Sequence, residues 1–118
     1  YSIGPDNAVH PRAFGSFPIC LGSFVREKKL MPLEKMINKM TGKTAELLQI
    51  EGKGIIADGY DADLVLLDPE TVAAKSDFVN SRALSDGIKR VIVAGETVYK
   101  DRKLTGKKPG KFISYKNR

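Results

Sequence analysis

The sequence changes its pattern at Gly52, and this change limits what the chain can fold into. Residues 17–50 repeat their apolar side chains at the intervals of an α-helix, whereas residues 52–118 place short apolar runs between glycines and prolines. The length of 118 residues suits one modest domain or a piece of a larger one. These features predict an α+β fold, in which a helical N-terminal segment is followed by a small antiparallel or mixed β-sheet.

The helical part is expected to hold three helices, and the middle one has the clearest pattern. Pro32 stands where a first-turn proline is tolerated, and Gly42 can end the helix in a left-handed conformation. The apolar residues between them follow at i, i+3, i+4 and i+7: Leu33, Met36, Ile37 and Met40. A preceding helix within residues 17–29 has one apolar face, formed by Phe17, Leu21, Phe24 and Val25. A short third helix is expected over residues 44–49, with Thr44 as its N-cap.

Three strands are expected in the glycine-rich part, at residues 62–68, 88–94 and 97–100. The last two flank Ala94-Gly95-Glu96, which is a signal for a hairpin. One further short strand is expected from Leu104 and residues 112–113. A polar, irregular segment separates the first two strands, and its expected apolar anchors are Phe78 and Val79.

This small sheet is expected to be incomplete by itself. Two to four strands leave an edge unpaired and an apolar face uncovered. The side chains expected on that face are Leu64, Leu66, Val91 and Val93. A second copy of the chain could cover them, so a homo-oligomer is expected.

The net charge of +6 is concentrated at the C-terminal end. Residues 99–118 carry eight Lys or Arg and one Asp, a net of +7, which leaves −1 for residues 1–98. This tail lacks the alternation of aromatic platforms and cations that binds single-stranded nucleic acid, so no nucleic-acid partner is expected. No apolar run reaches the roughly 18 residues of a membrane span, so no membrane partner is expected. The single cysteine, Cys20, excludes an intrachain disulfide and fits a cytoplasmic location.

The residues alone contain no complete catalytic or metal site. The chain has one histidine, His10, and lacks the His-x-His and His-Glu-x-x-His patterns, so no metal ligands are predicted in it. One segment nevertheless places a carboxylate, an imidazole and a guanidinium within seven residues: Asp6, His10 and Arg12. The planar fork of Arg12 can bind a substrate carboxylate, and His10 can orient it or donate a hydrogen bond. The alternative is a loop in which both side chains bond to backbone carbonyls.

The segment that starts at His10 resembles the N-acyl-D-amino-acid deacylase (D-aminoacylase) family of amidohydrolases, in which a His-Pro-Arg loop follows the last barrel strand. The residues that carry this resemblance are 10–18, 21–22, 25–27 and 39–41. Residues 54–68 resemble a wider amidohydrolase signature, the strand by which the chain re-enters a small β-domain beside the barrel. The next hairpin and the characteristic ending match at residues 91–96 and 104–110.

The resemblance implies a zinc-dependent hydrolase that cleaves the N-acyl amide of a small-molecule substrate, an N-acyl-D-amino acid. Zinc and the barrel then belong to the parent enzyme, and this chain is its C-terminal portion, inactive and without zinc by itself. The chain starts with Tyr1 rather than Met, as expected for a piece cut from something longer. The implied division is a catalytic-loop remnant, helices that close the barrel, and the C-terminal part of the small β-sandwich domain, at residues 1–16, 17–51 and 52–118.

Residue by residue, the resemblance assigns Arg12 to the α-carboxylate of the substrate and leaves the role of His10 open. Asp6 lies closer to His10 than the catalytic Asp of the family does. The catalytic Asp is therefore expected before Tyr1, with Asp6 as the other candidate. An alternative to this function is an independent basic, β-rich binding or assembly module without catalysis. The sequence predicts neither the acyl nor the side-chain preference.

Overall fold

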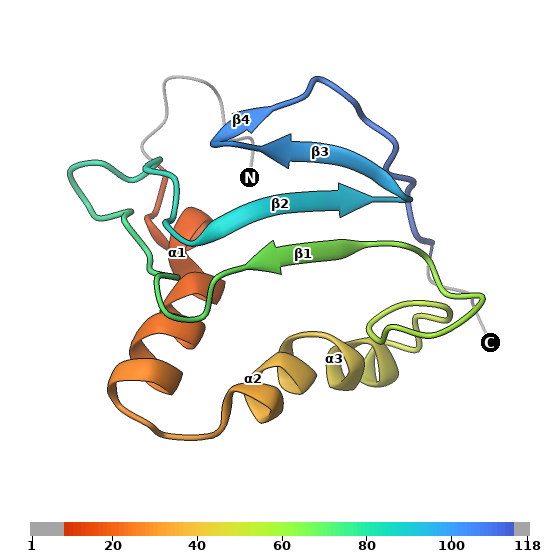
Figure 1. Cartoon of the computed structure of the whole chain (residues 1–118), viewed down its shortest axis with the longest axis horizontal. Coiled ribbons are helices and arrows are strands. Elements are labelled where there is room, and N and C mark those ends of the chain that lie inside the picture. Colours follow the sequence, from red (N-terminus) through yellow and green to blue (C-terminus); the bar gives the residue numbers. More distant parts are fainter. Residues whose placement is uncertain (1–8, 115–118) are drawn as a thin grey trace.

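The computed structural model describes residues 9–114, in which a helical part is followed by a sheet (Figure 1). The helical segments are α1 (Arg12–Ile19), the π-helix η1 (Cys20–Glu27), α2 (Leu33–Met40) and α3 (Gly42–Leu47). The strands are β1 (Leu64–Leu67), β2 (Ile88–Val93), β3 (Glu96–Lys100) and β4 (Lys103–Leu104). No helix within residues 9–114 is long and apolar enough to cross a membrane. The predicted α+β fold is confirmed.

The first helical segment begins at Arg12, inside the part that was expected to be a loop. Pro11 already has helical angles, with φ −53° and ψ −25°, so the helix starts without a change of direction. Pro18 lies inside α1 and has no N–H to donate to the carbonyl of Phe14, four residues earlier. The chain runs directly from α1 into η1, so residues 12–27 form one continuous helical segment.

The core lies where η1, α2 and the turn after β1 meet. Its buried side chains are Leu21, Met36 and Val72, which are 4%, 6% and 1% exposed. The partly buried side chains around them are Cys20, Phe24, Val25, Met31, Leu33, Ile37, Met40, Leu67 and Ile88. The predicted inner faces of the first two helices are therefore confirmed, except for Phe17, which is 62% exposed.

The boundary between α2 and α3 differs from the prediction. Gly42 does not end α2 in a left-handed conformation, because it is the first residue of α3. The break falls at Thr41, with φ −126° and ψ −92°. Thr44 lies inside α3 rather than at its N-cap, and its hydroxyl donates to the carbonyl of Lys39 at 2.7 Å. The third helix therefore starts two residues earlier than predicted.

The sheet is an antiparallel meander in the order β1-β2-β3-β4. The predicted hairpin is confirmed: Ala94 and Gly95 connect β2 to β3 with φ values of 48° and 78°, as a type I′ turn requires. The last strand is only Lys103–Leu104, and the strand predicted at residues 112–113 does not form. Figure 1 shows the helical part below and to the left of the sheet.

The register of the sheet corrects the expected apolar face. Leu64 lies opposite Ile92, and Val65 lies opposite Val91. Directly opposed residues share a face and neighbouring residues alternate, so Leu64 and Leu66 lie on one face and Val91 and Val93 on the other. The four residues expected on one face are thus divided between two.

A long excursion, residues 73–86, leaves the sheet between β1 and β2. Its two ends pair at an isolated antiparallel bridge between Ala73 and Asp86. The prediction that Phe78 and Val79 anchor this segment is wrong, because they are 83% and 98% exposed. The anchor is Val72, just before the excursion, because its side chain lies in the core.

Candidate functional site

The structure brings His10 and Arg12 together at the start of α1. Arg12 is the first residue of the helix, and both side chains are exposed. His10 Nδ1 accepts the backbone N–H of Arg12 at 3.1 Å, which satisfies one of the free N–H groups of the first turn. The guanidinium of Arg12 has no hydrogen-bond or ion-pair partner in the described part of the chain. Asp6, the remaining sequence candidate, lies outside the described residues.

This arrangement suits an anion. The N-terminal end of a helix carries partial positive charge, and Arg12 adds a full one with a planar pair of donors. Because Nδ1 of His10 accepts a hydrogen bond, the neutral ring carries its proton on Nε2. The Nε2–H of His10 can therefore donate a hydrogen bond to an anion bound beside Arg12.

The backbone beneath Arg12 is held by two serines of the excursion. Ser76 Oγ donates to the carbonyl of Pro11 at 2.9 Å, and Ser85 Oγ donates to the carbonyl of Phe14 at 3.2 Å. Sequence reasoning missed both serines. Pro18 could have indicated the contact that Ser85 makes. A proline inside a helix leaves the carbonyl four residues earlier, here that of Phe14, in need of another donor.

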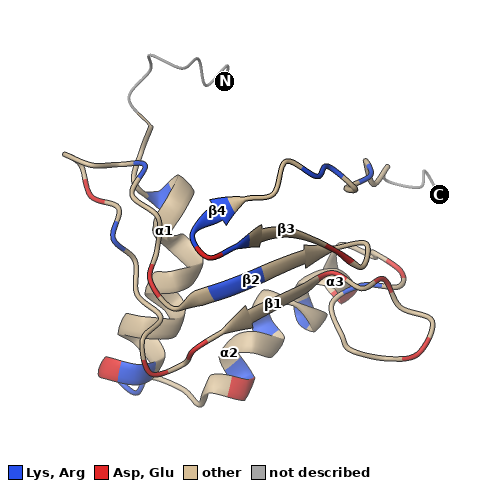
Figure 2. Cartoon of the chain, turned by 45° about the horizontal axis from the view of Figure 1, so that its top comes forward, with Lys and Arg blue, Asp and Glu red and all other residues tan. Residues whose placement is uncertain are grey.

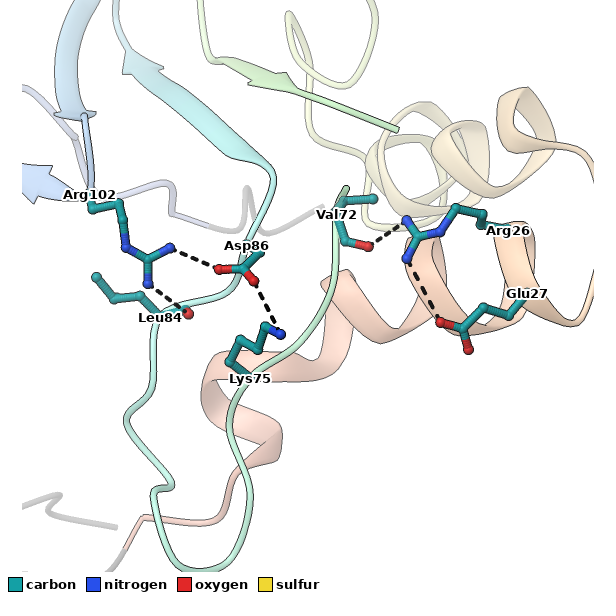
Figure 3. A network of polar contacts seen from close by, with 7 residues as sticks. All are labelled: Arg26, Glu27, Val72, Lys75, Leu84, Asp86 and Arg102. Atoms are coloured by element: carbon teal, nitrogen blue, oxygen red, sulfur yellow. Dashed lines mark hydrogen bonds and ion pairs between the residues drawn. The ribbon is translucent and has the colours of Figure 1, made fainter. Parts of the chain in front are cut away.

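The excursion is itself tied to the rest of the molecule by charged groups (Figure 3). Asp86 forms ion pairs with Lys75 at 3.2 Å and with Arg102 at 3.0 Å, which lower the pKa of its carboxyl. On the helical side, Arg26 Nη1 donates to the carbonyls of Pro69 at 3.0 Å and Val72 at 2.7 Å. Both ends of the excursion are therefore fixed.

A second charged cluster has a structural role. Lys53 forms an ion pair with Asp61 at 2.7 Å and another with Asp63. Asp63 Oδ1 also accepts the N–H of Ala94 in the hairpin at 2.8 Å. The hydrogen bonds from Lys53 and Ala94 lower the pKa of Asp63, and the hydrogen bonds to Asp61 and Asp63 raise the pKa of Lys53. The cluster joins the glycine-rich loop before β1 to the β2–β3 hairpin.

We expect Asp63→Asn to lower the free energy of unfolding of the chain by about 1 kcal/mol at pH 7, because the ion pair with Lys53 is lost. The folded-state pKa of Asp63 is lowered, so its contribution is present above the unfolded pKa of about 3.9 and is lost as the pH falls through the folded value. The folded-state pKa of Lys53 is raised, so the contribution of the ion pair is also lost at alkaline pH, when Lys53 loses its proton. Denaturant unfolding from pH 2 to 8 measures the difference.

The control for this prediction is Asp58→Asn. Asp58 is an exposed carboxylate of the same loop, with no ion pair or hydrogen bond in residues 9–114. Its replacement should leave the unfolding free energy unchanged at every pH. Equal losses in both variants would contradict a specific role for the Lys53–Asp63 pair.

Charged residues are spread over the helices, the loops and the sheet (Figure 2). Residues 9–114 contain no group of three His, Cys, Asp or Glu side chains that could hold a metal ion. The described residues therefore do not fit a metal centre. What they offer is an exposed cation and an imidazole donor at the start of α1.

The comparisons with known proteins agree on one family. The model of the amidohydrolase family matches residues 9–99. D-aminoacylase from Alcaligenes xylosoxydans xylosoxydans is 39% identical over 109 residues, which are 92% of this chain and 22% of that protein. The chain thus spans about a fifth of the length of this relative.

The solved structures that match this chain are enzymes of the same kind. A crystal structure of D-aminoacylase matches with a TM-score of 0.81 and 42% identity, over 83% of this chain and 21% of that one. N-acyl-D-glutamate deacylase from Bordetella bronchiseptica, complexed with zinc and a phosphonate that mimics the tetrahedral intermediate of the reaction, matches with a TM-score of 0.76 and 37% identity. That match covers 80% of this chain and 20% of that one. Since the family model matches most of the sequence and the fold agrees, the chain belongs to the amidohydrolase family.

Proposed function

We propose that the chain forms part of a metal-dependent deacylase that hydrolyses the N-acyl amide of D-amino acids. The observation that carries the proposal is the exposed guanidinium of Arg12, placed at the N-terminal end of α1 beside His10 and unpaired within residues 9–114. Arg12 would bind the α-carboxylate of the substrate through two parallel hydrogen bonds. The relatives support the proposal, since D-aminoacylase and N-acyl-D-glutamate deacylase are named for this chemistry.

In this proposal the chain supplies substrate binding, and the rest of the enzyme supplies the metal. Zinc is the proposed metal, because the related N-acyl-D-glutamate deacylase was crystallised with zinc. The catalytic Asp is either Asp6 or a residue before Tyr1. The 118-residue chain by itself is proposed to be inactive and free of zinc, and the enzyme to be cytoplasmic.

The proposed division of the chain keeps three parts. Residues 1–16 would belong to the catalytic loop, residues 17–51 to the helices that close a barrel, and residues 52–118 to the small β-domain. The start of α1 at Arg12 means that the loop passes into the helical part at the residue proposed to bind substrate.

The test is an assay of the enzyme that contains this chain. N-acetyl-D-amino acids with neutral and acidic side chains are incubated with the zinc-loaded enzyme, with the L enantiomers and the chelated enzyme as controls. Hydrolysis of the D enantiomers alone, lost on chelation and restored by zinc, is the expected result. Failure to cleave any N-acyl-D-amino acid would contradict the proposed function.

One observation favours the alternative, a basic binding module. Arg90 lies opposite Lys100, and Lys100 lies opposite Lys103, so three cations form a row across β2, β3 and β4. Directly opposed like charges destabilise a sheet, which an acidic partner would relieve. Binding of heparin to the chain, with an affinity that falls steeply as salt rises, would favour this module.

We expect the chain to form a dimer through the other face of the sheet, which carries a row of apolar side chains: Val65, Val91, Tyr99 and Leu104. Val65 and Leu104 are 56% and 81% exposed, and burying such side chains gives roughly 1.5–3 kcal/mol each. Sedimentation equilibrium of the chain measures the association.

A matched pair of substitutions tests which face associates. Val65→Lys places a charge on the apolar row and should yield a monomer. Leu66→Lys places the same charge on the opposite face, beside Arg90, and should leave the dimer intact. A well-folded monomer of the unmodified chain at high micromolar concentration would contradict the prediction.

A further inference from the structure

We infer that the excursion, residues 73–86, positions the His10–Arg12 segment, and that Phe78 sets the orientation of the His10 ring. The inference rests on the proposed function, because it assigns a role in substrate binding to a segment that follows β1. It concerns a positioning residue, since Phe78 acts on the substrate only through His10.

The first support is the pair of serine hydrogen bonds. Pro11 and Phe14, whose carbonyls accept them, lie directly before and two residues after Arg12. The carbonyl of Phe14 is the one that Pro18 leaves without its helical donor. The excursion therefore completes the hydrogen bonding of the helical turn that carries Arg12.

The second support is the close approach at Gly15, which is buried. A Cβ atom built at Gly15 would lie 2.6 Å from Oγ of Ser76 and 3.2 Å from Cβ of Ala74. A side chain at position 15 would therefore displace the Ser76 hydroxyl, which donates to the carbonyl of Pro11. The two segments are thus in direct contact, although more than 55 residues separate them in the sequence.

The third support is the set of contacts that hold the excursion itself in one conformation. Its ends are joined at the Ala73–Asp86 bridge, and Asp86 is held by Lys75 and Arg102 (Figure 3). At its tip, one carboxylate oxygen of Asp77 accepts two backbone N–H groups, from Val79 at 2.8 Å and Asn80 at 2.6 Å. These bonds fix the turn that presents Phe78.

The contact itself joins two rings. The centroids of Phe78 and His10 lie 5.2 Å apart with an interplanar angle of 77°, which is an edge-to-face arrangement. The hydrogen bond from the N–H of Arg12 fixes where Nδ1 points, and the Phe78 ring restricts rotation of the imidazole plane. Together they direct the Nε2–H of His10, the donor available beside Arg12.

Phe78 contributes little to the core, because its side chain is 83% exposed. Its replacement should therefore leave the stability of the fold unchanged and disturb His10. This separates a positioning role from a structural one. The matched control is Val79→Ala, since Val79 is the next residue of the same tip, is 98% exposed and has no aromatic ring to pack against His10.

The first test uses the fact that His10 is the only histidine in the chain. Proton NMR of the 118-residue chain then shows one set of imidazole resonances. Phe78→Leu should shift them, Phe78→Tyr should keep them near their original positions, and Val79→Ala should leave them unchanged. Identical imidazole resonances in the unmodified chain and in Phe78→Leu would overturn the inference.

The second test measures kinetics in the enzyme that contains this chain. Phe78→Leu should raise KM for the N-acyl-D-amino acid roughly 2- to 10-fold with kcat nearly unchanged, and Phe78→Tyr should restore it. A Phe78→Leu enzyme with unchanged KM would also overturn the inference. Absence of hydrolysis by the unmodified enzyme would instead refute the proposed function, and the NMR comparison would still test the contact between Phe78 and His10.

Discussion

Replacement of Gly87 by alanine is expected to lower the free energy of unfolding of the chain by about 3 kcal/mol or more. Gly87 has φ of +76°, a left-handed conformation that disfavours any residue with a Cβ atom. A Cβ built there would lie 2.4 Å from both N and Cα of Val72, which are backbone atoms and cannot turn aside. Since Val72 is 1% exposed in the core, the strain would spread to Leu21 and Met36. Thermal and denaturant unfolding measure the loss.

Two further glycines separate the causes of this effect. Gly59→Ala introduces only the backbone strain, because Gly59 has φ of +81° and open space around it, so about 1 kcal/mol is expected. Gly22→Ala introduces only crowding, with Cβ at 2.5 Å from the carbonyl oxygen of Val72. Gly87→Ala should cost more than either. A loss no greater than that of Gly59→Ala would show that Val72 moves aside freely.

The sequence predicted the elements whose side chains repeat at regular intervals. The inner face of α2 was predicted because its apolar residues recur at i, i+3, i+4 and i+7. The β2–β3 hairpin was predicted because Ala94-Gly95-Glu96 separates two apolar runs. The boundaries were less accurate. Gly42 was placed at the end of a helix, whereas it begins the next one.

The contacts of the excursion were not predicted from the periodicity of the sequence. Its most apolar residues, Phe78 and Val79, were expected to be its anchors, yet the anchor is Val72. The reason is not local, since Arg26 of η1 bonds to the carbonyl of Val72 from 46 residues away. No periodic pattern encodes a contact of this kind. The register that divides the apolar residues of β1 and β2 between two faces was likewise not visible in the sequence.

The sequence singled out Arg12 and His10 as candidates, but it did not reveal the structure around them. Arg12 and His10 were chosen because a carboxylate, an imidazole and a guanidinium stand within seven residues, and because this segment resembles the D-aminoacylase family. In the structure the His10 ring contacts the backbone N–H of Arg12. They were expected in a loop, whereas Arg12 begins α1 and the His10 ring accepts its N–H. Ser76 and Ser85 support this turn across 65 and 71 residues, which explains why the sequence could not reveal them.

If the enzyme that contains this chain is the proposed deacylase, replacement of Arg12 by lysine is expected to weaken transition-state binding by about 1.5–3 kcal/mol, roughly a ten- to hundredfold loss in kcat/KM. Lysine keeps the positive charge at the N-terminal end of α1 but loses the planar fork that can bind both oxygens of a carboxylate. Within residues 9–114 the guanidinium has no hydrogen-bond or ion-pair partner. The loss in kcat/KM should therefore come from weaker substrate binding and not from a less stable fold. Steady-state kinetics with N-acyl-D-amino acids measure it, with Arg90→Lys on the sheet as the matched control.

The decisive comparison uses a substrate whose α-carboxylate is replaced by a neutral amide. If Arg12 binds the carboxylate, the unmodified enzyme should lose activity on this amide, and Arg12→Lys should lose little more, because the two changes remove the same interaction. If Arg12 only supports the turn, its substitution should cost the same on both substrates and should also lower the melting temperature. An equal loss of kcat/KM on the acid and the amide would therefore refute the assignment of Arg12 to the α-carboxylate.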